Sequence, residues 1–143
     1  CMQMRQSLDR DSPENPSMPE PRGELTLRTI AMPADTNAAG DIFGGWVMAQ
    51  MDLACGMRAA ERAGGRVVTA AVNEMSFQKA MKVGDTLSVY THIERVGRTS
   101  MTLRVEAWAQ RYLTPAVELV TFATFVMVAL GPDGRPSPVP EDR

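Results

Sequence analysis

Residues 44–63, with the sequence GGWVMAQMDLACGMRAAERA, decide the fold of this protein. Most of these residues are good helix formers, and the first three turns of the expected helix carry almost no polar side chain. A helix that is apolar on every side is typical of a buried helix. Gly64 and Gly65 follow, as glycine often does at a helix end. The sequence therefore predicts one long buried helix, roughly 30 Å in length.

The segments around the helix alternate between apolar and polar residues, which is typical of β-strands. We predict one strand before the helix, at 25–30, and further strands after it at 66–77, 86–96, 99–110 and 119–130. The last segment is apolar on both faces, which indicates an interior strand. The order β-α-β-β-β-β predicts an α+β fold, in which an antiparallel sheet of about five strands curls round a central helix.

Within 99–110 the alternation predicts which side chains face the helix and which face away. The inward set is Met101, Leu103, Val105 and Ala107, and the outward set is Thr102, Arg104, Glu106 and Trp108. The single histidine, His92, falls on the polar face of its strand, where we expect it at the surface or at an interface.

The whole chain has 143 residues, the usual size of one domain. Proline-rich polar ends predict flexible tails at 1–22 and 131–143, leaving a folded domain at 23–130. The net charge of −2 argues against a general nucleic-acid-binding protein. No apolar run reaches the roughly 18 residues of a membrane span, and no signal peptide is recognisable. We therefore expect a cytoplasmic protein with neither nucleic acid nor membrane as a partner.

Several kinds of active site are excluded by residue type. The chain has no Gly-x-Ser-x-Gly nucleophile motif and no phosphate-binding loop. One histidine and two cysteines argue against a zinc site, so no metal is expected. Cys55 lies in the apolar helix without a basic neighbour, which argues against a reactive thiolate. Cys1 and Cys55 are expected to stay unpaired, as suits a reducing compartment.

Residues 31–46, with the sequence AMPADTNAAGDIFGGW, closely resemble the short acyl-CoA thioester hydrolases of the hot-dog superfamily, the YciA-like group. The resemblance continues through 50–52, 66–69, the Phe77 region, 83–85 and 97–100, and it covers about 25–130. It implies a hot-dog fold and hydrolysis of acyl-CoA thioesters, with CoA as part of the substrate and no separate cofactor. It also implies a homodimer at minimum, often assembled into a hexamer as a trimer of dimers.

The family's acidic residue in this motif corresponds to Asp41, so the resemblance implies a catalytic role for it. Asp41 would act as a general base on water or attack the thioester carbonyl itself. The alternative is a carboxylate that caps the helix. Many relatives have a proline where this chain has Ala80, so we expect the loop there to differ. Hot-dog dehydratases rely on a histidine in the active region, and its absence from this motif disfavours lyase activity.

Gly44 and Gly45 lie where the helix begins, and their N–H groups would be among the first four without intrahelical partners. The helix dipole adds positive potential there, and glycine lets a ligand approach the backbone closely. These amides are therefore candidate donors to the oxyanion that develops on the thioester carbonyl. The alternative is a tight turn from loop to helix.

Two further polar residues are candidates for the catalytic set. Asp52 comes eleven residues after Asp41, on nearly the same helix face but roughly 16 Å along the axis. Other hot-dog thioesterases use an acidic residue at this helix position; the alternative is a buried carboxylate bonded to backbone or hydroxyl groups. Asn37 precedes the motif and would orient water or the substrate, or else form a turn.

Candidate substrate-binding residues lie on the strands and on a hairpin turn. Thr69 and Phe77 would line the acyl site, although a β-branched strand residue such as Thr69 needs no special role. Arg98 would bind phosphate, while Thr99 and Ser100 would bind the pantetheine chain; the alternative is an ordinary hairpin. Lys79, Lys82 and Arg135 are weaker candidates for phosphate.

A competing function is an acyl-CoA-binding or regulatory hot-dog protein without turnover. The retention of Asp41 argues against it, because binding alone does not require a carboxylate beside an electron-rich thioester.

Overall fold

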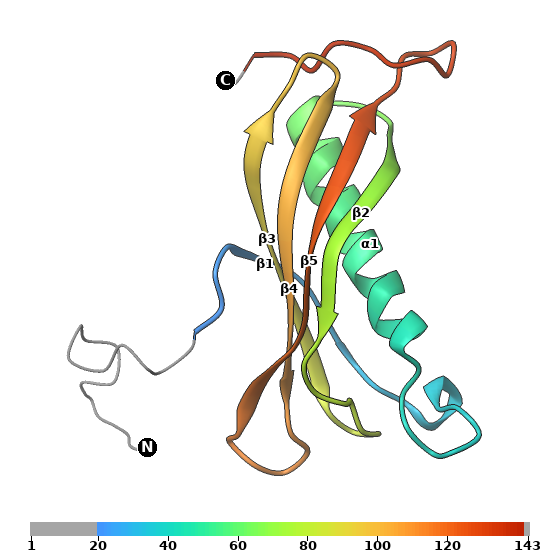
Figure 1. The fold of residues 1–143 in the computed structure, drawn as a ribbon, viewed down its shortest axis with the longest axis vertical. Coiled ribbons are helices and arrows are strands. Elements are labelled where there is room, and N and C mark those ends of the chain that lie inside the picture. Colours follow the sequence, from blue (N-terminus) through green and yellow to red (C-terminus); the bar gives the residue numbers. More distant parts are fainter. Residues whose placement is uncertain (1–19, 142–143) are drawn as a thin grey trace, which may run out of the picture.

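The computed structural model describes residues 20–141, which form one long helix against one antiparallel sheet (Figure 1). The strands are β1 (Glu24–Ile30), β2 (Val67–Phe77), β3 (Thr86–Val96), β4 (Ser100–Gln110) and β5 (Val117–Ala129). The helix α1 spans Gly44–Ala63, and a short 3-10 helix, η1, spans Pro33–Asp35. The predicted order of one strand, one helix and four strands is confirmed. Most of the predicted N-terminal tail lies outside the described residues.

The strand order across the sheet is β1-β3-β4-β5-β2, with every neighbouring pair antiparallel. β5 lies between β4 and β2, so its prediction as an interior strand is confirmed. β1 and β2 form the two edges, and α1 connects them in sequence. The helix therefore runs along the inner face of the sheet, and its start and its end lie at opposite ends of the molecule (Figure 1).

One stripe of α1 packs into the core. Its buried residues are Val47, Met51, Ala54, Cys55 and Ala59, which follow the spacing of one helix face. The sheet meets this stripe with inward side chains of its interior strands. These include Leu87, Val89, Met101, Leu103, Val105, Phe125 and Met127, all fully or almost fully buried. The predicted inward set of β4 is thus confirmed.

The prediction that the helix is buried on all sides is wrong for a single chain. Met48, Leu53 and Met57 are 39%, 56% and 50% exposed. The five strands cover one side of the helix and do not close round it (Figure 1). Several exposed large apolar side chains on one element are typical of an interaction site. Within residues 20–141, no helix has the length and apolar character needed to cross a bilayer.

The outer face of the sheet contains a buried carboxylate that alternation alone did not predict. Glu106 and Trp108 face away from the helix, yet they are only 3% and 4% exposed. The Trp108 Nε1–H donates to Glu106 Oε1 at 3.0 Å, and Arg104 Nε donates to Oε2 at 3.1 Å. The backbone N–H of Arg22 donates to Oε1 at 3.1 Å. The chain before β1 therefore packs against this cluster and helps to bury it.

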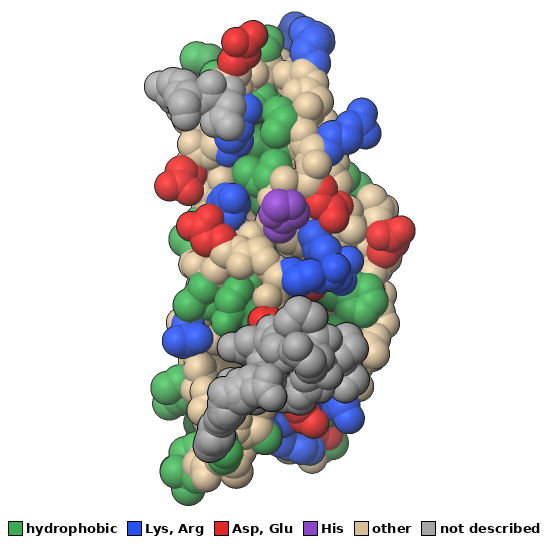
Figure 2. All heavy atoms as spheres, turned by 90° about the vertical axis from the view of Figure 1, so that its left-hand side faces the viewer, with side chains coloured by type: hydrophobic (Ala, Val, Ile, Leu, Met, Phe, Trp, Pro, Cys, Tyr) green, Lys and Arg blue, Asp and Glu red, His purple; other side chains and the backbone are tan. Residues whose placement is uncertain are grey.

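The same outer face carries exposed charges around the cluster. The single histidine, His92, is exposed on β3, as predicted, and Figure 2 shows it among basic and acidic side chains. The Arg104 guanidinium also lies 5.1 Å from the ring centroid of Phe122, within the range of a cation–π contact. This face is therefore polar around one buried glutamate.

The C-terminal segment, for which a flexible tail is predicted, contacts the rest of the domain as far as Pro140. The N–H groups of Ser137 and Val139 donate to the carbonyl groups of Ala129 and Arg98, each at 2.8 Å. Arg62 Nη1 donates to the Pro140 carbonyl at 2.7 Å, and Val139 packs against the core. Prolines 136, 138 and 140 lack an N–H, so the alternate residues between them supply the donors. Composition alone cannot show this pattern, because it depends on where the carbonyl groups lie.

Replacing Glu106 by Gln tests the outer cluster. Burial by itself raises the pKa of Glu106, but the hydrogen bonds from Trp108, Arg22 and Arg104 outweigh burial and lower that pKa. The carboxylate therefore stabilises the fold above its unfolded pKa, and this contribution is lost as pH falls through the lowered folded value. At pH 7, Glu106→Gln should reduce the free energy of unfolding by about 1.5–3 kcal/mol.

The difference between wild type and Glu106→Gln should shrink as pH falls below the ordinary glutamate value of about 4.3. Urea unfolding at equal protein concentration, at neutral and acidic pH, measures both differences. A difference that stays constant across this range would contradict the assignment.

Candidate active site

The loop between η1 and α1 is folded round the side chain of Asn37. Its Oδ1 accepts the N–H groups of Ala39 and Asp41 at 2.9 and 3.1 Å. Its backbone N–H donates to the Asp41 carbonyl at 2.7 Å. Gly40 has a φ of 87°, which favours glycine at this point of the turn. These are the bonds of a turn-forming asparagine, and they set the backbone position of Asp41.

Asp41 projects from this loop just before the helix, with its side chain 45% exposed. Lys82 Nζ lies 2.6 Å from Asp41 Oδ1. The N-cap residue of α1 is Phe43, and no side chain caps this helix end. The alternative role of Asp41 as a helix cap is therefore not observed, and its carboxylate is directed toward Lys82 instead.

The first amides of α1 lie beside open space. Within residues 20–141, the N–H groups of Gly44 and Gly45 have no hydrogen-bond partner, whereas those of Trp46 and Val47 donate to the Phe43 carbonyl. A Cβ built on Gly45 would meet no atom within 4 Å, and one on Gly44 would lie 3.3 Å from the Phe77 ring. Gly44 thus allows the close approach of Phe77, and Gly45 leaves its amide accessible.

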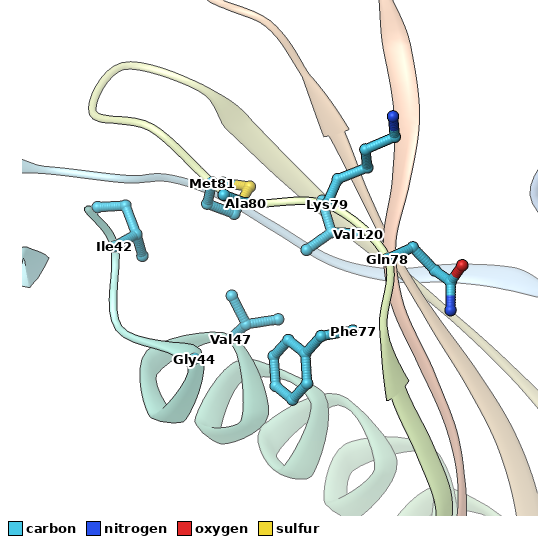
Figure 3. A pocket seen from close by; sticks show the side chains of 9 residues that line it. All are labelled: Ile42, Gly44, Val47, Phe77, Gln78, Lys79, Ala80, Met81 and Val120. Atoms are coloured by element: carbon cyan, nitrogen blue, oxygen red, sulfur yellow. The ribbon is translucent and has the colours of Figure 1, made fainter.

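A cavity of about 370 Å³ opens at this helix start. It is lined by Ile42, Gly44, Val47, Phe77, Gln78, Lys79, Ala80, Met81 and Val120 (Figure 3). The Phe77 ring lies over the first turns of the helix, whereas the polar ends of Gln78 and Lys79 point away from it. Ile42, which lines the cavity, directly follows Asp41. The cavity is therefore mainly apolar inside, and Asp41 precedes the lining residue Ile42 without lining the cavity itself.

Ala80 and Met81 line this cavity, and residues 80–82 are held by an ion pair between the buried Asp85 and Arg111. Asp85 Oδ2 accepts Arg111 Nη1 at 2.7 Å and the Lys82 N–H at 3.0 Å. Arg111 Nη1 also donates to the Ala80 carbonyl at 2.9 Å. Burial by itself lowers the pKa of Arg111, but hydrogen bonds to Glu118 and Asp85 outweigh it and raise that pKa. No local sequence pattern indicates Arg111, because it is distant in sequence from Ala80 and Asp85.

Asp52 and Thr69 form a separate pair on the exposed side of α1. The Thr69 hydroxyl donates to Asp52 Oδ1, and both residues line a broad hollow of about 700 Å³ with Leu53, Gly56 and Met57. Asp52 is exposed in the single chain, so it lacks the burial of the alternative interpretation, but it has the hydroxyl bond which that interpretation predicts. Asp52 lies in the middle of α1, whereas Asp41 lies in the loop before it. The structure does not bring the two carboxylates together within one chain.

The hairpin with Arg98, Thr99 and Ser100 lies at the other end of the molecule from Asp41 (Figure 1). The Gly97 N–H donates to the Ser100 carbonyl at 2.7 Å, which closes the predicted turn. The Thr99 carbonyl accepts the Ala129 N–H at 2.9 Å. Arg135 lies in the C-terminal segment at this same end. Within one chain, these candidate CoA contacts therefore do not reach the cavity beside Asp41.

Cys55 is unsuited to nucleophilic catalysis. Burial, and secondarily the charge of Asp52, raises the pKa of its thiol to about 12. The thiolate, which is the reactive form, is therefore scarce at neutral pH. Among the residues that the structure describes, no three His, Cys, Asp or Glu side chains are grouped so that they could hold a metal ion.

Comparison with known proteins places this geometry in a family. The thioesterase superfamily model matches residues 39–116. The acyl-CoA thioester hydrolase YciA of Salmonella typhimurium is 46% identical over 123 residues, which cover 84% of this chain and 92% of that protein.

Two crystal structures of relatives share the fold. A hexameric thioesterase from Yersinia pestis superposes with a TM-score of 0.82 at 45% identity, covering 85% of this chain and 99% of that one. A hexameric hotdog fold thioesterase of Campylobacter jejuni gives a TM-score of 0.78 at 39% identity, covering 82% and 91%. The chain therefore belongs to the thioesterase superfamily and, within it, to the hot-dog-fold group of acyl-CoA thioester hydrolases that includes YciA.

Proposed function

We propose that this protein hydrolyses acyl-CoA thioesters to free CoA and a carboxylate. The observation that carries the proposal is the combination of an Asp41 carboxylate on the loop before α1, the unpaired N–H groups of Gly44 and Gly45, and an apolar cavity lined by Ile42 and Gly44. The YciA relative is named as an acyl-CoA thioester hydrolase, which supports the substrate class. The reaction needs water and the protein's own groups, and we propose no separate cofactor.

In the proposed mechanism, the Asp41 carboxylate takes a proton from water while the water oxygen attacks the thioester carbonyl carbon. Alternatively, Asp41 attacks this carbon itself and water then hydrolyses the mixed anhydride. In both cases the carbonyl oxygen gains negative charge, which the N–H groups of Gly44 and Gly45 would stabilise. The C–S bond then breaks and the CoA sulfur leaves as a thiolate, which takes up a proton. The apolar cavity would receive the acyl chain.

We further propose that the working unit is at least a homodimer and that it assembles into a hexamer, as the relatives of known structure do. The exposed apolar face of α1 and the exposed Val68, Val72 and Phe77 of edge strand β2 support this proposal. The position of the Arg98–Ser100 hairpin supports it too. A second chain could bring its hairpin and its Asp52–Thr69 pair to the cavity that a single chain leaves without CoA contacts.

Replacing Asp41 by Asn should abolish most turnover while leaving CoA affinity largely unchanged. The amide has nearly the same shape but cannot take up the proton, so kcat should fall by about 10²–10⁴-fold. Thiol release from a panel of acyl-CoAs measures turnover, and titration with CoA measures affinity. Full activity of the variant would contradict the assignment of Asp41. No turnover by the wild type would favour a binding protein.

Replacing Asp52 by Asn separates the two candidate carboxylates. The asparagine can still accept the Thr69 hydroxyl, and position 52 lies away from the cavity in the same chain. We expect a smaller loss of kcat than for Asp41→Asn, measured on the same acyl-CoA panel. An equal or larger loss would make Asp52 the principal catalytic carboxylate and would contradict the assignment of that role to Asp41.

Replacing Leu53 by Asp should weaken association of the chains. Leu53 is 56% exposed on the apolar side of α1, and a charge there would be costly to bury between two subunits. Light scattering coupled to size exclusion should show smaller assemblies and a loss of thioesterase activity. Leu113→Asp is the matched control, since Leu113 is 84% exposed in the loop after β4. Unchanged assembly in Leu53→Asp would contradict the proposed interface.

A further inference from the structure

We propose that Lys82 is a positioning residue, whose ammonium group holds the Asp41 carboxylate in its working orientation. The inference rests on the proposed function, because it assigns a task to a neighbour of the proposed catalytic aspartate. From the sequence alone, Lys82 is only a weak candidate for binding phosphate. Its contact with Asp41 arises from the tertiary fold.

The contact itself fixes one oxygen of the carboxylate and leaves the other free. Lys82 Nζ donates to Asp41 Oδ1 at 2.6 Å, the distance of a short charge-assisted hydrogen bond. Within residues 20–141, no other group donates to either oxygen of this carboxylate. Oδ2 therefore stays available to accept a proton from water or to attack a carbonyl carbon.

The loop that carries Asp41 fixes its backbone but not its side chain. Asn37 bonds the N–H and the carbonyl of Asp41, which sets where the side chain begins. A side chain of this kind still has several staggered rotamers open to it. The Lys82 contact selects among these rotamers. Because small misplacements of a reacting group can lower a rate by about 10²-fold, the selection has a catalytic consequence.

Lys82 can perform this task because its own backbone is held from the core side. Its N–H donates to Asp85 Oδ2 at 3.0 Å, and Asp85 is only 2% exposed. Asp85 is fixed in turn by Arg111 Nη1 at 2.7 Å and by the Tyr112 N–H at 2.9 Å. The buried Asp85 thus fixes the backbone of the exposed Lys82.

A second link joins the lysine segment directly to the aspartate loop. The Ile42 N–H donates to the Met81 carbonyl at 3.4 Å, so the residues next to Asp41 and Lys82 are bonded backbone to backbone. The two side chains therefore start from positions that are fixed relative to each other. This arrangement distinguishes the pair from an ordinary surface ion pair between independent loops.

The experiment compares Lys82→Gln with Lys82→Arg in the full chain, by thiol release from a panel of acyl-CoAs. Lys82→Gln should lower kcat by about 10–100-fold with KM little changed, since positioning acts on the chemical step. Lys82→Arg should restore most of kcat, because a guanidinium can also donate to the carboxylate. Arg95→Gln, which removes a charge from the far end of β3, is the control for net charge and should leave kcat unchanged.

The double variant Asp41→Asn with Lys82→Gln supplies the decisive comparison. If Lys82 acts through Asp41, removing the lysine should not lower the residual turnover of Asp41→Asn any further. An equal loss in both backgrounds, a change confined to KM, or wild-type kcat in Lys82→Gln would each overturn the inference. Full activity of Asp41→Asn would overturn the proposed function itself. An inactive Asp41→Asn beside a fully active Lys82→Gln would overturn only the role of Lys82.

Discussion

The packing of one stripe of α1 against the inner face of the sheet is the contact on which the rest of this structure depends. The buried residues from Val47 to Ala59 anchor the helix along its length. This anchoring sets its first turn beside the end of β2 and creates the cavity next to Gly44 and Gly45. The same contact uses only one side of an apolar helix. The opposite side, with Leu53 and Met57, is left exposed in a single chain.

The candidate site combines an exposed chemical group with supports that are fixed by hydrogen bonds. Asp41 is half exposed on a loop, yet its neighbours are fixed by the Asn37 turn on one side and by Asp85 and Arg111 on the other. The Gly44 and Gly45 amides belong to the start of α1, which is anchored in the core along one face. Groups held in place before the substrate arrives need little reorganisation during the reaction, which is the usual source of electrostatic catalysis in enzymes.

The candidate site residues lie at two separate ends of a single chain. The carboxylate and the cavity lie where α1 begins, whereas the candidate CoA contacts at Arg98 and Thr99 lie near its end (Figure 1). The helix between them is roughly 30 Å long, so no side chain can bridge the distance. The Asp52–Thr69 pair lies between the two ends on the uncovered side. A second chain that covers this side is the simplest way to bring the separate parts to one substrate.

The sequence by itself determined the helix at 44–63, the strand order along the chain, the inward set of β4 and the motif that contains Asp41, because periodicity and local residue type encode these features. Only the tertiary structure decided that the helix is covered on one side, that Glu106 is buried on the outer face, and which groups the C-terminal segment contacts. It also brought Lys82 to Asp41 and Arg111 to Asp85. Lys82 and Asp41 are 41 positions apart in the sequence, and Arg111 and Asp85 are 26 positions apart. Such pairings depend on how the strands are arranged and not on any local pattern.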